Sequence, residues 1–187
     1  GVFGVCGPAQ KYQHGMIRYL LQCMASVAEE YPVEVHIFDD VKRKFAELKD
    51  LSIVKNYTLD TDAALTVISD WHKRLEDRYQ AMLDNPDAKG DNSLLVMVIQ
   101  NNDVAKRIND DFDAMNLYTE ITTRYKSLGV CIIFANYENA SVSYDAPEPL
   151  RYYYGLGYYT HSQQAEHVAM TRHKQKEPEY PSVCPAL

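Results

Sequence analysis

Residues 94–99 read LLVMVI, and this uninterrupted apolar run decides the fold class. A strand without polar alternation is buried on both faces, which is typical of the middle of a parallel sheet. Further short strands are predicted at residues 2–6 (VFGVC), 33–38 (VEVHIF) and 130–135 (VCIIFA). The chain therefore supplies at least four strands that are separated by long intervening segments.

The intervening segments carry helical patterns of apolar residues, clearest in the third of them. Helices are expected over residues 15–30, 41–50, 61–83 and 104–126. Strands that alternate with helices predict an α/β protein with a mostly parallel sheet and helices on both faces. Ligands bind such sheets beyond the carboxyl ends of the strands, so we expect a site in the loops after Cys6, Ile99 and Ala135.

Composition limits the class of protein. The 187 residues have the length of one domain, which can bury a core without disulfides. The formal net charge of −7 argues against nucleic acid as a partner, because such a surface needs clustered lysine and arginine. The four cysteines form no C-x-x-C pair and are expected to be small core residues in a reducing compartment. The chain shows no signal peptide or membrane-spanning run, and because it begins at Gly1 we expect a piece of a longer protein.

The segment after the first strand has the position of a P-loop. A P-loop reads G-x-x-x-x-G-K-[ST]: its N–H groups cradle phosphates, its lysine reaches the outer phosphates and its hydroxyl holds magnesium. The corresponding residues here are Gly7, Pro8, Ala9, Gln10, Lys11, Tyr12, Gln13 and His14. Tyr12 would obstruct the close approach of phosphate, Gln13 lacks the charge and His14 replaces the hydroxyl. Lys11 could supply a charge, although it lies two positions early.

The strand at 94–99 is followed by amides where an ATPase needs carboxylates for the metal and the general base. The residues at those positions are Gln100 and Asn101; Asp103 comes later and is expected to cap the next helix. Each electrostatic group missing from a catalytic site costs about 3–4 kcal/mol of transition-state stabilisation. The sequence therefore predicts a degenerate nucleotide site with no catalytic residue, no metal and no certain cofactor, where ATP binds weakly if at all.

The order of these elements resembles the FtsK/SpoIIIE family of P-loop ATPases, and most closely the C-terminal ATPase-like modules of the EssC-type motors of type VII secretion. The matching stretches are GPAQKYQ (7–13), VEVHIFDD (33–40), DWHKRLEDRYQAML (70–83), LLVMVIQNND (94–103) and LGVCIIFANYENASVSYDAPEPL (128–150). The resemblance implies a RecA-like P-loop domain over residues 1–150. It also implies a cytoplasmic position behind the transmembrane helices of a bacterial motor, beside similar modules, and recognition of secreted helical-hairpin proteins.

Residues 151–187 depart from that resemblance, and we expect them to complete the domain or to form a tail. Tyrosines cluster at 152–159. They could form a docking surface or a base-stacking platform, although packing against the chain's own sheet is the simpler interpretation. His161, His167 and His173 are not spaced for one helix face, which argues against a metal site.

Three hypotheses remain open. The first is a non-hydrolysing module that recognises substrates or regulates export, with other modules of the motor, a secreted protein or a second copy as partners. The second is an active ATPase that uses Lys11 and Asp103, or groups from a neighbouring subunit. The third is an unrelated small-ligand enzyme with a flavodoxin-like sheet.

Overall fold

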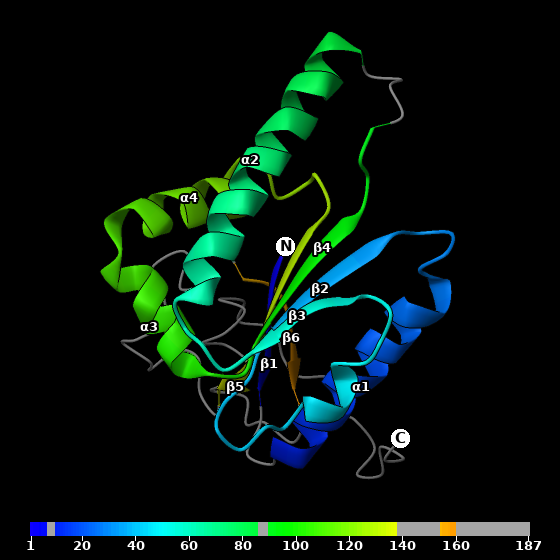
Figure 1. The fold of residues 1–187 in the computed structure, drawn as a ribbon, viewed down its shortest axis with the longest axis vertical. Coiled ribbons are helices and arrows are strands. Elements are labelled where there is room, and N and C mark those ends of the chain that lie inside the picture. Colours follow the sequence, from blue (N-terminus) through cyan, green and yellow to red (C-terminus); the bar gives the residue numbers. More distant parts are fainter. Residues whose placement is uncertain (7–9, 86–89, 138–153, 160–187) are drawn as a thin grey trace, which may run out of the picture.

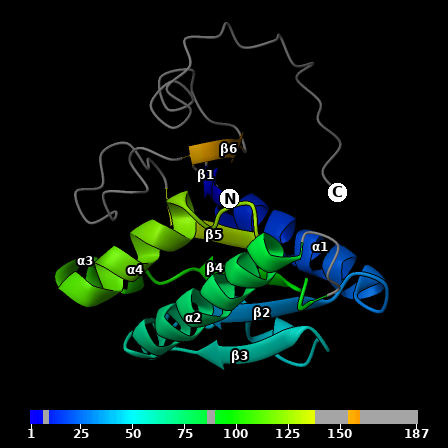
Figure 2. The ribbon, with the colours of Figure 1, turned by 90° about the horizontal axis from the view of Figure 1, so that it is seen from above.

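The computed structural model describes residues 1–6, 10–85, 90–137 and 154–159. Its sheet has six parallel strands in the order β3-β2-β4-β5-β1-β6 (Figures 1 and 2). The strands are β1 (Val2–Cys6), β2 (Val33–Phe38), β3 (Val54–Thr58), β4 (Leu94–Ile99), β5 (Val130–Tyr137) and β6 (Tyr154–Tyr159). The predicted α/β fold with a parallel sheet is confirmed.

Helices cover both faces of the sheet (Figure 2). The described helices are α1 (Gln10–Val27), the short 3₁₀-helix η1 (Ala46–Leu48), α2 (Ala63–Asp84), α3 (Asn102–Asp110) and α4 (Phe112–Thr123). Helix α1 and η1 pack on one face, and α2, α3 and α4 pack on the other. None of the described helices is long and apolar enough to cross a membrane.

Strand β4 forms the centre of the core. Leu95, Met97 and Ile99 pack toward α2, whereas Val96 and Val98 pack toward α1, and all five are fully buried. The continuous apolar run LLVMVI therefore serves two cores at once, as the sequence predicted.

Three expected helices differ in the structure. Helix α1 begins at Gln10 instead of near residue 15, because Gln13 and His14 are buried on the same side as Ile17. Polar residues at these positions hid the helical pattern. The segment 41–50 forms turns and η1 instead of a longer helix.

The expected helix over 104–126 is two helices, α3 and α4. Asp111 separates them, because its side chain accepts a hydrogen bond from the N–H of Ala114 (3.0 Å) and so begins a new helix. Two strands that the sequence did not place, β3 and β6, extend the sheet at its two edges. The tyrosine-rich stretch thus includes a strand, β6, which pairs with β1.

The cysteines were expected in the core, and one of the two that can be compared is not there. The Cys131 side chain is mostly buried, and this burial raises the pKa of its thiol to about 11. Cys23 is exposed on α1. The interpretation of every cysteine as a core residue was therefore wrong.

Candidate functional site

The candidate site lies at the carboxyl edge of the sheet, where β2 and β4 end side by side. The N–H groups of Gln100 and Asn101 both donate to the carbonyl of Phe38, at 2.9 and 3.2 Å. After this point the segments that follow the two strands diverge. The segment after β2 leads through η1 to the face of the sheet covered by α1, and the segment after β4 leads through α3 to the opposite face. Such a divergence is the topological switch at which α/β sheets bind ligands.

Asp39 organises the loop that follows β2. Its carboxylate is fully buried and accepts hydrogen bonds from four groups. The donors are the N–H groups of Asp40 (2.8 Å), Lys44 (3.2 Å) and Phe45 (2.8 Å) and the hydroxyl of Tyr57 (2.9 Å). Burial and the bond to this carboxylate raise the pKa of Tyr57 to about 12. Asp39 therefore holds the loop 39–45 in one conformation, in which Arg43 adopts a positive φ of 52°.

This loop packs against the first half of α1. The ring of Phe45 meets the ring of His14 edge to face, with centroids 5.2 Å apart. Arg18 ion-pairs with Glu47 and donates to the carbonyl of Lys44 at 2.7 Å. The loop after β2 thus closes over the side of α1 on which His14 lies.

His14 is a buried, neutral histidine at the centre of this edge. Only 4% of its surface is exposed, and burial, reinforced by the charges of Arg18 and Lys44, lowers its pKa. Interactions with Gln100 and Asp39 oppose this shift but do not cancel it. The imidazole therefore brings together the two halves of the predicted site, the segment 7–14 and the end of β4, without supplying a charge.

The other residues of the degenerate P-loop are placed as follows. Gly7, Pro8 and Ala9 lie outside the described residues, and only these three positions separate β1 from α1. Gln10, Lys11 and Tyr12 form the first turn of α1. Gln13, at the position of the P-loop lysine, is fully buried.

Gln100 and Asn101 occupy the positions of the expected carboxylates. Gln100 is buried, with 1% of its surface exposed. The Asn101 side chain accepts a hydrogen bond from the N–H of Asp103 at 3.0 Å and so caps α3. The prediction that Asp103 is the cap was wrong: Asp103 is an exposed residue in the first turn of α3. An acidic residue there favours the helix through the dipole, which explains its position without any catalytic role.

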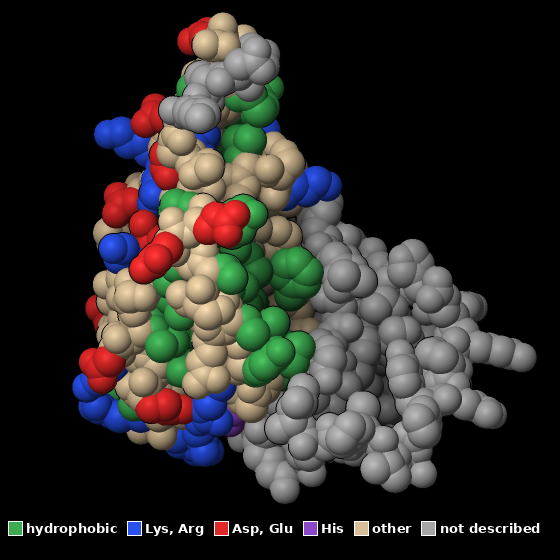
Figure 3. Space-filling view, turned by 90° about the vertical axis from the view of Figure 1, so that its right-hand side faces the viewer, with side chains coloured by type: hydrophobic (Ala, Val, Ile, Leu, Met, Phe, Trp, Pro, Cys, Tyr) green, Lys and Arg blue, Asp and Glu red, His purple; other side chains and the backbone are tan. Residues whose placement is uncertain are grey.

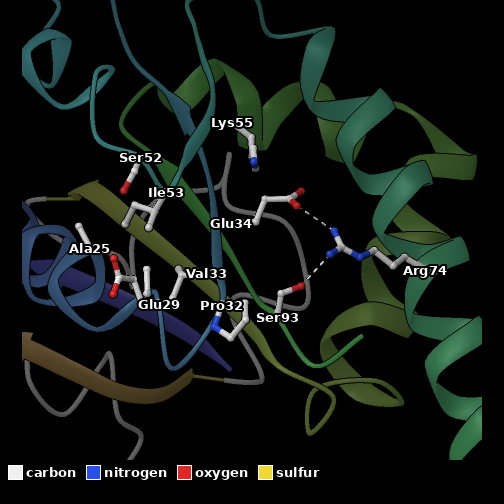
Figure 4. Close-up of a pocket in the computed structure, with 11 residues that line it drawn as sticks. Ala25, Glu29, Pro32, Val33, Glu34, Ser52, Ile53, Lys55, Arg74 and Ser93 are labelled. Atoms are coloured by element: carbon white, nitrogen blue, oxygen red, sulfur yellow. Dashed lines mark hydrogen bonds and ion pairs between the residues drawn. The ribbon is translucent and has the colours of Figure 1, made fainter. Parts of the chain in front are cut away.

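At the opposite, amino edge of the sheet lies a hollow of about 480 Å³ (Figure 4). Glu34 and Ser93 face it and both contact Arg74, whose guanidinium donates to them at 2.9 and 2.7 Å. Arg74 and Arg78 also ion-pair with Asp91, and their hydrogen bonds lower the pKa of that carboxyl although partial burial opposes them. These charges satisfy one another, so this network stabilises the loop before β4.

No known family profile and no curated protein sequence matches the chain. Among solved structures, EssC (ATPases 2 and 3) from Geobacillus thermodenitrificans matches all of the chain with a TM-score of 0.68 and 18% identity. The chain shares the fold of this EssC structure. The cytoplasmic domain of EssC matches 91% of the chain with a TM-score of 0.64 and 17% identity.

A third match extends the similarity to another motor. The cytoplasmic domain of the Thermomonospora curvata type VII secretion ATPase EccC matches 73% of the chain, with a TM-score of 0.54 and 20% identity. The chain spans 36% and 35% of the two EssC structures and 18% of the EccC structure, that is, about a third of each or less. The predicted RecA-like fold, and the resemblance to secretion ATPases at the level of fold, are confirmed.

Proposed function

We propose that this chain is an ATPase-like module of a type VII secretion motor that recognises substrates or regulates export and hydrolyses little or no ATP. The observation that carries the proposal is the burial of three neutral side chains, Gln13, His14 and Gln100, at the carboxyl edge. In a P-loop ATPase this edge needs a lysine, a hydroxyl and a carboxylate. The similarity of fold to EssC supports the choice of motor.

Phosphoryl transfer depends almost entirely on positioned charges and a metal ion. At the carboxyl edge, the oxygens of the buried Asp39 carboxylate already accept four hydrogen bonds within the protein. Arg18 is likewise engaged by Glu47. Asp39 and Arg18 therefore stabilise the loop after β2, and their hydrogen bonds and ion pair engage them within the protein.

The direct test is turnover of ATP by the purified chain. We expect no magnesium-dependent hydrolysis above a protein-free control, and calorimetry should show weak ATP binding that changes little when magnesium is removed. Binding below about micromolar Kd that requires magnesium would contradict the proposal, because such binding needs metal ligands that Gln100 and Asn101 do not provide.

A second candidate, an active ATPase with substitute residues, rests on one observation. Asp103 is exposed at the start of α3, and Lys11 lies in the first turn of α1, so both are near the carboxyl edge. The variants Lys11→Ala and Asp103→Asn separate the candidates. Turnover in the parent chain that either variant abolishes, with unchanged thermal stability, would establish the second candidate and overturn the first.

The proposal extends to partners and location. We place the module on the cytoplasmic side of a membrane-anchored bacterial motor, beside other ATPase modules, with a secreted helical-hairpin protein as its substrate and a second copy as a further partner. The tyrosine cluster at 152–159 is the proposed docking surface. Tyr158→Ala should reduce co-purification of such a substrate without lowering thermal stability; intact binding by a folded variant would exclude that surface.

A further inference from the structure

Helix α1 has two different flanks beside its buried face. On one flank Arg18, Gln22 and Ser26 follow one another at a spacing of four residues. Arg18 ties this polar flank to Glu47 and to the carbonyl of Lys44, both in the segment between β2 and β3. The polar flank therefore faces the β3 side of the sheet.

The other flank is apolar and exposed. It consists of Tyr19, Cys23, Val27 and Tyr31, each four residues after the last, and we call it the apolar flank. Tyr19, Val27 and Tyr31 are 51%, 47% and 61% exposed, and Cys23 is exposed as well. Tyr31 lies beyond the end of α1, and its N–H donates to the carbonyl of Val27 at 2.9 Å, which holds it next to the last turn of the helix. Figure 3, which views the α1 side of the molecule, shows hydrophobic side chains gathered in a band on this face.

The apolar flank faces the β1–β6 side, because the polar flank faces the other way. Exposed apolar stripes of this length usually mark a surface that something covers. The sheet order makes β6 the outermost strand on that side, and the chain continues from its carboxyl end at residue 160. We propose that the C-terminal segment, residues 160–187, covers the apolar flank of α1.

Topology supports this occupant over the segment that joins β5 to β6. The connections from β3 to β4 and from β4 to β5 each lead to a strand that lies nearer to β6 in the sheet. The helices of both connections lie on the α2 face. A right-handed connection from β5 to β6 steps the same way and is therefore expected on the α2 face too. This leaves the α1 face beside β6 open to the proposed segment 160–187, whose sequence includes the apolar residues Val168, Met170, Val183 and Leu187.

Cys23 lies in the middle of the apolar flank and can report on its cover. In the full chain, we expect a maleimide to label Cys23 at least about ten-fold more slowly than a matched cysteine on the polar flank, Gln22→Cys in a Cys23→Ser background. Peptide mapping by mass spectrometry distinguishes the sites. Equal rates, or protection of Cys23 that increases with protein concentration as a second copy would require, overturn the proposal.

Two variants of the full chain identify the occupant. Val168→Asp with Val183→Asp should raise the labelling rate of Cys23 to that of the polar-flank cysteine, whereas Gln163→Asp with Ser182→Asp adds the same charge and should leave it slow. Because the first variant could also unfold the chain, a photoreactive residue at Tyr19 gives an independent measurement in the parent sequence. Cross-links from monomeric protein to peptides within 160–187 support the proposal, and cross-links confined to other peptides refute it.

Discussion

Replacing Asp39 by alanine should be among the most destabilising single changes in this chain. The substitution removes the acceptor for three N–H groups and one hydroxyl. In the variant, the N–H of Asp40 can donate to water instead. The bond from the N–H of Lys44 is the longest of the four, at 3.2 Å, so its loss should cost the least. The N–H of Phe45 cannot donate to water, because Phe45 is fully buried, and the Tyr57 hydroxyl is partly buried as well.

The magnitude follows from these two donors. Hydrogen bonds to a charged group contribute about 1.5–3 kcal/mol each, and removing the burial cost of the carboxylate offsets part of the loss. The expected decrease in the free energy of unfolding is about 3–5 kcal/mol, a large fraction of the usual stability of a domain. Asp39→Asn keeps one acceptor oxygen and should lose less, about 2–3 kcal/mol.

Urea unfolding followed by the fluorescence of Trp71 measures this loss. Trp71 is the single tryptophan, and it is buried on the opposite face of the sheet, so it reports on the whole domain. Asp40→Ala is the matched control, since Asp40 is the neighbouring carboxylate and the bond that its side chain accepts from the N–H of Lys42 is exposed. A loss below about 1 kcal/mol for Asp39→Ala, or one equal to that of the control, would refute the role assigned to Asp39.

Three further predictions concern other parts of the structure. The pKa of His14 is lowered from 6.5, so at acidic pH the imidazole binds fewer protons in the folded chain than in the unfolded chain, and the free energy of unfolding falls as the pH drops below about 6.5. His14→Gln should weaken this fall, measured as urea midpoints between about pH 7.5 and 5.5. An unchanged pH profile would contradict this role of His14. Arg78→Ala should lower the free energy of unfolding by about 2–4 kcal/mol, because the buried guanidinium donates to Asp91 and to the carbonyls of Ser93 and Leu128. Arg107→Ala, on the surface, should cost much less, and similar thermal midpoints for the two variants would count against this prediction. The triple variant Tyr12→Gly, Gln13→Lys and His14→Thr restores the P-loop residues and should lower stability, since it buries an ammonium group at position 13. It should not increase the affinity for ATP. A folded variant that binds ATP tightly would disprove this prediction.

The fold could be predicted where burial and sequence pattern agree. Strands β2 and β4 have the predicted bounds, because apolar residues there serve only the core. The start of α1 could not be predicted, since its buried face carries Gln13 and His14, and polar residues at core positions break the pattern. Strand β3, with the sequence VKNYT, lies at the edge of the sheet and needs few apolar residues.

The candidate site was predicted only in part. The positions of Gln100 and His14 follow from the rule that ligands bind at the carboxyl ends of parallel strands, and the structure brings these two residues together. Asp39 was missed as an organising residue. A signal for it existed, because Asp39 directly follows β2 at the same edge, but a carboxylate at a strand end does not reveal whether it faces a ligand or its own loop.

The packing of the carboxyl edge links the proposed loss of catalysis to stability. A hydrolysing site keeps space and unpaired charge for a nucleotide, and such groups are costly to the folded state. Here the ring of Phe45 packs on His14, Gln100 is buried beside them, and Asp39 uses its charge to hold the loop. Asp39 in particular stabilises the domain at the place where an ATPase keeps charged groups for its substrate. A domain closed in this way keeps a rigid framework, and we therefore expect its partners to bind on outer surfaces and not at the switch between β2 and β4.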